Sequence, residues 1–157
     1  MPQRLSDVPM ADLIPETRDW NNGLGIDLES WIGCTGGFEQ AIGYGVLFWP
    51  EFLEMDGCVF FAGVAETNYR DWMQHTGGDK RAVETVLNHR HITDLFSGQG
   101  AQPSRHQVLY LGRLLREIWG VKLASDFPQR RFVVSFPENG SEDLLDHVVT
   151  FYQAGEA

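Results

Sequence analysis

Two stretches of the chain carry apolar residues at three- and four-residue steps, which predicts amphipathic helices. The first runs over Lys80–Phe96, with Asp79 placed to cap its N-terminus. The second runs over about Ser104–Ser125, and Asp126-Phe127-Pro128 follows as a stop signal. These two stretches are the expected long helices of the fold.

Shorter helices are predicted before and between them. Asp27 is placed to cap a short helix over Leu28–Ile32. A helix over Phe38–Phe48 ends before a proline, although its two glycines weaken it by about 1 kcal/mol each. A further short helix is expected over Glu66–Gln74.

Residues 1–25 are rich in Pro, Asp, Asn and Gly and predict an irregular N-terminal arm. At most a turn of helix is expected around Met10–Leu13. Trp20 and Leu24 are the apolar side chains expected to hold this arm against the core.

Two β-hairpins are predicted. Asp56-Gly57 stands between the apolar runs Phe52–Met55 and Cys58–Phe61, and Asp-Gly is a strong hairpin signal because both residues tolerate positive φ. Arg131–Phe136 and His147–Tyr152 form a second pair of β-prone runs with a long loop between them.

These elements together predict an α+β domain that spans residues 1–157. An antiparallel sheet of about four strands, made of the two hairpins, would pack against the two long helices in two layers. Each element offers one good apolar face, and a two-layer arrangement buries such faces. The chain length of 157 residues and the hydrophobic fraction of 43% are both typical of a single folded domain.

The net charge of −10 narrows the classes of partner. It argues against a nucleic-acid partner and against docking on an anionic membrane, since both need a basic surface. The longest nearly apolar window, Ala41–Pro50, is far shorter than the roughly 20 residues that span a bilayer. No signal-like apolar run stands near the N-terminus, so a soluble, cytoplasmic protein is expected. Cys34 and Cys58 are expected to be buried free thiols.

The densest group of reactive side chains lies within the first predicted long helix: Asn88, His89, Arg90, His91 and Asp94. On a helix His89 and His91 would point about 200° apart and could not share a metal ion. No metal site is therefore expected, and Asn88 and His91 are interpreted as residues that tie the helix to its neighbours by hydrogen bonds. The glycine-rich stretches lack the spacing of phosphate-binding loops, so no cofactor is expected.

The preferred functional hypothesis is a small acidic module, of a bacterial type, that binds and inhibits or regulates a basic protein. Its most concrete version is an immunity protein that neutralises a toxin. Ten of the 22 carboxylates fall in residues 1–60 against two arginines, and such a negative face steers a basic partner. The expected contact residues form two patches: Trp49, Glu51, Glu54 and Asp56, and then Glu138, Glu142 and Asp143.

Two alternatives remain open from the sequence. One is a small hydrolase that uses His91 and Asp94 with His89, with or without a metal. The other is a self-assembling structural subunit. A monomer and a homodimer are both compatible with the sequence, and burial is expected for Trp20, Trp49 and Trp72.

Overall fold

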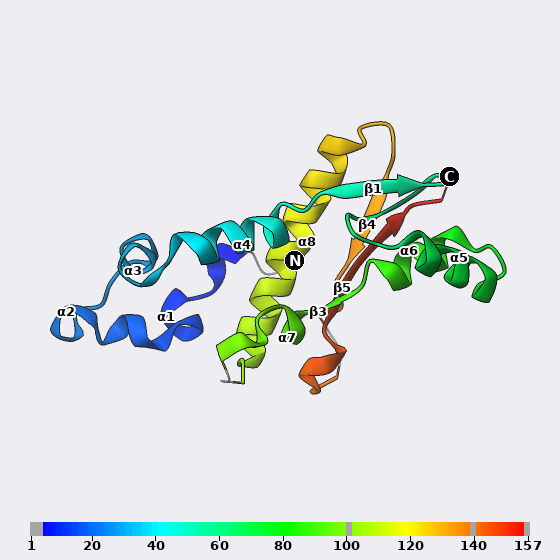
Figure 1. The fold of residues 1–157 in the computed structure, drawn as a ribbon. Helices are drawn as coiled ribbons and strands as arrows, with labels where there is room; N and C mark the ends of the chain where they lie inside the picture. The colour runs from blue at the N-terminus through cyan, green and yellow to red at the C-terminus, as the bar shows by residue number, and fades with distance from the viewer. Residues whose placement is uncertain (1–4, 100–101, 139–140, 156–157) are drawn as a thin grey trace.

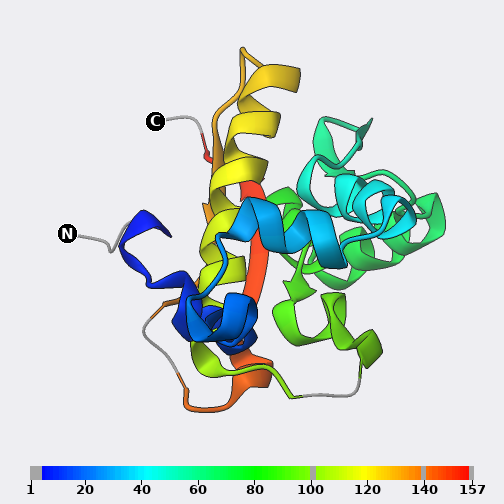
Figure 2. The ribbon, with the colours of Figure 1, turned by 90° about the vertical axis from the view of Figure 1, so that its left-hand side faces the viewer.

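The computed structural model describes residues 5–99, 102–138 and 141–155 and shows an α+β fold with two antiparallel sheets. The long helix α8 (Arg105–Asp126) runs through the middle of the molecule. The N-terminal helices extend to one side of α8 and the first hairpin lies on the other side (Figure 1). Figure 2, turned by 90°, shows α8 running along the C-terminal strand.

Helix α8 matches its predicted range closely because its sequence carries both a start signal and a stop signal. The Ser104 hydroxyl accepts from the Gln107 amide at 3.2 Å, and the Gln107 side chain accepts from the Ser104 amide at 2.8 Å. This capping box satisfies two amides that an α-helix leaves without partners. One face of α8 is buried through Val108, Leu115, Trp119 and Leu123.

The C-terminal hairpin is confirmed and gains a third strand. Strands β4 (Phe132–Ser135) and β5 (Val148–Gln153) pair antiparallel, and β3 (Arg90–His91) pairs with the other edge of β5. The order is therefore β3-β5-β4. The connection before β5 contains the 3₁₀ turn η4 (Leu144–Asp146).

The first hairpin is also confirmed, with strands β1 (Phe52–Met55) and β2 (Cys58–Phe61). Asp56 and Gly57 have φ values of 50° and 82°, which is the left-handed geometry that a type I′ turn requires. The hairpin forms a two-stranded sheet of its own, so the expected strands divide between two sheets.

The first predicted long helix is much shorter in the structure. Helix α6 (Lys80–Leu87) begins as predicted, since the Asp79 carboxylate accepts from the Ala82 amide at 3.0 Å. It ends at Leu87, where the prediction of a helix to Phe96 is wrong. The chain continues into β3 and the short helix α7 (Ile92–Leu95).

The reason lies in Asn88, which is fully buried. Its amide nitrogen donates to the carbonyls of Val59 at 2.9 Å and Phe151 at 3.2 Å, and its amide oxygen accepts from the Phe61 amide at 3.3 Å. These are backbone groups of β2 and β5. The interpretation of Asn88 as a hydrogen-bonded tie is therefore confirmed.

Glu84, one helical turn earlier, makes a similar connection. Its buried carboxylate accepts from the Val59 amide at 2.8 Å and from the Gln153 amide at 2.7 Å. Glu84 and Asn88 thus stand beside β2 where a neighbouring strand would, and they link the two sheets through side chains. Buried backbone groups need such partners, because leaving one unpaired costs about 1–3 kcal/mol.

Aromatic rings fill the space between α8 and the sheets. The Phe61 ring lies 4.8 Å from Trp119 and 5.1 Å from Phe151, measured between centroids. Phe52 lies 5.3 Å from Phe151 in an edge-on arrangement. Edge-on pairs at these separations are favourable beyond the area they bury.

The remaining elements are short. Helix α5 (Glu66–His75) follows the first hairpin. The N-terminal segment contains six short elements: η1 (Leu5–Asp7), α1 (Met10–Leu13), η2 (Pro15–Arg18), α2 (Trp20–Gly23), α3 (Leu28–Thr35) and α4 (Phe38–Phe48). The predicted turn of helix at Met10–Leu13 and the helix over Phe38–Phe48 are confirmed. Asp27 caps α3 as predicted, accepting from the Ser30 amide at 2.9 Å.

The N-terminal segment is attached to α8 differently from the expectation. Leu13 is buried, and its carbonyl accepts from the Gln107 side chain at 2.7 Å. Leu24 is 90% exposed, so its predicted anchoring role is wrong, whereas Trp20 is half-buried. Helix α4 is held to α8 where the Trp119 indole donates to the Leu47 carbonyl at 2.9 Å. No helix within the described residues has the length and apolar character needed to cross a membrane.

Candidate functional site

The first predicted acidic patch lies around the β1–β2 hairpin. Trp49 is 52% exposed, which corrects the expectation that it is buried, and Glu51 beside it is exposed. Glu54 accepts from Arg130 at 2.7 Å, so its charge is already paired within the chain. Asp56 occupies the hairpin turn and is exposed. Of these carboxylates, Glu51 and Asp56 present side chains with no ion pair among the described residues.

The second predicted acidic patch also contains both a carboxylate that is paired with arginine and carboxylates that are exposed. Glu138 lies between Arg113, at 3.2 Å, and Arg116, at 2.8 Å, and its side chain is 20% exposed. Asp143 caps η4 by accepting from the Leu145 amide at 2.9 Å. Glu142 is exposed. The sequence could not show these pairings because the arginines stand far away along the chain.

The histidine cluster has a geometry that differs from the helical expectation. His89 and His91 lie beyond the end of α6, and their ring centroids are 5.4 Å apart, so the predicted opposite orientation is wrong. The Nδ1 atom of His91 lies 2.8 Å from the Leu145 carbonyl oxygen. Asp94 is exposed on α7. The residues that the structure describes contain no group of three His, Cys, Asp or Glu side chains able to hold a metal ion.

An apolar stripe on α4 is the surface feature that sequence reasoning missed. Phe38, Ile42 and Val46 follow at four-residue steps and are 91%, 74% and 72% exposed. Trp49, three residues further on at the C-cap of α4, is also exposed. We call these four residues the α4 apolar face. The side chains of Tyr44, Leu47 and Phe48 point toward the body of the protein. The signal in the sequence was therefore a helix with apolar residues on two opposite sides, only one of which the body covers.

The α4 apolar face is extended by α3 and belongs to an acidic segment of the chain. Ile32 of α3 is also exposed, and it lines a shallow hollow together with Phe38. Residues 5–51 contain eight carboxylates and a single arginine, Arg18, which is paired with Asp12. An apolar surface on an acidic segment is complementary to an apolar surface that carries basic groups.

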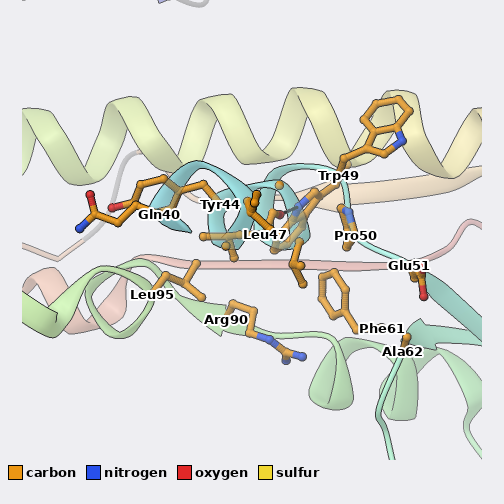
Figure 3. Close-up of a pocket in the computed structure, with 15 residues that line it drawn as sticks. Gln40, Tyr44, Leu47, Trp49, Pro50, Glu51, Phe61, Ala62, Arg90 and Leu95 are labelled. Carbon is orange, nitrogen blue, oxygen red and sulfur yellow. Dashed lines mark hydrogen bonds between the residues drawn. The ribbon is translucent and has the colours of Figure 1, made fainter. Parts of the chain in front are cut away.

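A cavity of about 890 Å³ lies between α4 and the body, and Ile42, Val46 and Trp49 of the α4 apolar face contribute to its lining (Figure 3). Its apolar walls include Leu47, Leu95 and Trp119. Figure 3 shows Arg90 and Leu95 across the cavity from Tyr44 and Leu47. A concave, mainly apolar space lined by two charged residues, Arg90 and Glu51, has the general character of a small-molecule site.

The two cysteines differ in exposure, and the expectation that both are buried is wrong for Cys34. Cys58 is fully buried in β2, whereas Cys34 is exposed on α3. Burial raises the pKa of the Cys58 thiol to about 11, and the nearby Glu84 adds to this shift. A thiol is nucleophilic as the thiolate, so Cys58 is protected by both its pKa and its burial.

We expect a disulfide reagent such as 5,5′-dithiobis(2-nitrobenzoate) to modify one thiol of the native protein at pH 8 and two after unfolding in guanidinium. The Cys34→Ser variant should show almost no reaction until it is unfolded. Fast reaction of that variant in the native state would mean that β2 opens readily, contrary to its buried position.

Comparisons with protein-family models, with curated proteins and with solved structures find no match for this chain. The class that the structure defines is an α+β protein with a two-stranded and a three-stranded antiparallel sheet. Its function is therefore argued from its surfaces.

Proposed function

We propose that this protein is a binding module for a basic protein, which it inhibits or regulates, and that its most concrete form is an immunity protein that neutralises a toxin. The observation that supports this proposal is the exposed α4 apolar face on an acidic segment of the chain. No catalytic residues need to be invoked for such a role.

The apolar face supplies the affinity. Phe38, Ile42 and Val46 expose most of their side chains, and large contiguous apolar patches on folded proteins usually mark interaction sites. Aromatic side chains dominate the binding energy of many interfaces, and Phe38 and Trp49 stand toward the two ends of this stripe. A partner that covers α4 would therefore bury two aromatic anchors.

The charge selects the kind of partner. Residues 5–51 carry eight carboxylates and one cationic side chain, Arg18, so this segment has a strongly negative net charge. A second copy of the chain docked face to face on α4 would bring two such acidic segments together, and like charges at an interface are unfavourable. A basic partner gains from the same field and associates faster at low salt.

The predicted contact residues fall into two groups under this proposal: exposed residues, and carboxylates that are already paired with arginine. Trp49 belongs to the α4 apolar face, and Glu51 stands two residues further along the chain, so both are proposed contacts. Glu142 and Asp56 are exposed and remain predicted contacts. Glu54 and Glu138 would reach a partner only by exchanging their arginine neighbours, which reduces their expected contribution.

The test is a quantitative pull-down from the source cells with the wild-type chain and the Phe38→Ser, Ile42→Ser, Val46→Ser triple variant, at low and high salt. We expect the wild type to retain a stoichiometric basic protein that salt weakens. With that protein purified, the triple variant should bind it at least about a hundredfold more weakly, equivalent to ~2.7 kcal/mol. Its unfolding free energy should change by less than about 1 kcal/mol, because exposed positions contribute little to folding.

A matched control removes exposed apolar side chains elsewhere: Val121→Ser, Val133→Ser and Leu145→Ser. This variant should bind the partner like the wild type. Equal binding by wild type and α4 variant would refute the proposed interface. A wild-type dimer that the α4 variant converts to a monomer would instead assign this face to self-association.

A further inference from the structure

The cavity behind α4 contains a guanidinium with no anionic partner. Arg90, on β3, is half-buried and lines the cavity. No carboxylate oxygen of the described residues lies within 4.0 Å of its guanidinium, although the chain carries 22 carboxylates. By contrast, Arg113, Arg116 and Arg130 are each paired with a glutamate.

The contacts of Arg90 fix its position and leave donors free. Its Nη1 donates to the carbonyls of His89 at 2.8 Å and Leu87 at 3.3 Å. The guanidinium carbon lies 4.6 Å from the centroid of the Phe61 ring, which covers one face of the group. Arginine has five N–H donors, so Nη2 and Nε keep theirs without a partner in the described structure.

Burial makes this unpaired charge unfavourable. Loss of solvent lowers the pKa of Arg90 below its ordinary value, which reflects the cost of holding the cation there. An anion bound to Nη2 and Nε would offset that cost through a charge-assisted hydrogen bond. The residues that line the cavity determine which kind of anion can bind there.

The walls favour an apolar body on that anion. Leu47, Leu95 and Trp119 line the space, and its volume of about 890 Å³ lies in the range of small-molecule sites. Glu51 also lines the cavity, and Figure 3 places it beyond Phe61 from Arg90. The negative end of a ligand is therefore directed to Arg90 and away from Glu51.

Gly43 keeps part of this space open. Gln40, Val46 and Leu47 all line the cavity, and these residues surround Gly43 on the helix surface. A Cβ built on Gly43 would meet no atom within 4 Å. Because Gly43 itself lines the cavity, a larger side chain at this position is expected to occupy part of the space.

From these observations we propose that the cavity binds a small amphipathic carboxylate, with the carboxylate on Arg90 and a hydrocarbon chain along Leu47 and Leu95. This site shares Ile42, Val46 and Trp49 with the α4 apolar face, but it rests on a separate observation, the guanidinium of Arg90 without a carboxylate partner among the described residues. Decanoate is a suitable probe for this class of ligand. Decyltrimethylammonium, with the same chain and a positive head group, is the matched comparison.

The experiment is a titration of the full chain with each probe, followed by calorimetry and by NMR signals of the Gly43 amide and the Arg90 side-chain N–H groups. The net charge of −10 favours the cationic probe over the surface as a whole. Saturable binding of decanoate that shifts both signals, at least about tenfold tighter than the cation, would support the site. Equal binding of the two probes, or no saturable binding, would overturn it.

Variants locate the binding. Arg90→Met keeps the packing on Phe61 and should weaken decanoate at least about tenfold, the effect of losing one charge-assisted contact. Gly43→Leu should block decanoate while keeping α4 helical. The controls are Arg131→Met, at an exposed arginine, and Gly33→Leu, at an open glycine of α3; both should bind like the wild type. Full affinity in Arg90→Met, with the fold intact by circular dichroism, would refute the proposal.

Discussion

Replacing Asn88 by alanine should lower the free energy of unfolding by about 3–5 kcal/mol, the largest effect expected for a single side chain here. The substitution removes one amide group that serves three backbone atoms: the Val59 and Phe151 carbonyls and the Phe61 amide. All three belong to buried residues of β2 and β5. Each group left unpaired contributes about 1–3 kcal/mol of the cost.

Urea unfolding followed by circular dichroism measures this effect, with Asn68→Ala as the control. Asn68 is exposed on α5, so its replacement should change stability by no more than about 0.5 kcal/mol. A cost for Asn88→Ala as small as that of the control would mean that the two sheets do not depend on this side chain. The link between α6, β2 and β5 would then need another explanation.

The same residue explains where prediction of the fold succeeded and where it failed. Elements with local start and stop signals were predictable: the Ser104 cap and Pro128 bound α8, and Asp56-Gly57 specifies the first hairpin. The end of α6 carried no such signal, since apolar residues continue at helical spacing through Ile92 and Leu95. What ends that helix is hydrogen bonding to strands 29 and 63 positions away in the sequence.

The candidate surfaces were likewise predictable only as far as they depend on residues close together in the sequence. Phe38, Ile42 and Val46 are spaced as one helix face in the sequence, but the sequence does not say which side of an all-apolar helix is covered. The body covers the side of Leu47 and Phe48, and this left the other side exposed. Likewise, Arg90 was visible as one charge among several, and its lack of a carboxylate partner became evident only in three dimensions.

Gly112→Ala is the second substitution with a large expected effect, a loss of about 2–3 kcal/mol in the free energy of unfolding. A Cβ at position 112 would lie 2.1 Å from Cζ of Phe136, far inside the roughly 3.5–4.0 Å of a normal carbon contact. Phe136 is buried, with its ring centroid 6.0 Å from that of His147, so it has little room to withdraw. Helix propensity alone would favour alanine by about 1 kcal/mol, so the clash must reverse the sign.

Gly120 provides the matched control because it lies on the same helix, where a Cβ would meet its nearest atom, Cγ2 of Val134, at 3.9 Å. Gly120→Ala should therefore raise stability, by up to about 1 kcal/mol, while Gly112→Ala lowers it. Trimming the ring with Phe136→Leu should make Gly112→Ala less costly, with a coupling of at least about 1 kcal/mol in a double-mutant cycle. If both glycine variants were stabilised alike, α8 would not be packed on Phe136 as closely as the structure shows. Opposite signs with strong coupling would instead establish that the missing side chain at Gly112 is what lets the Phe136 ring pack against α8.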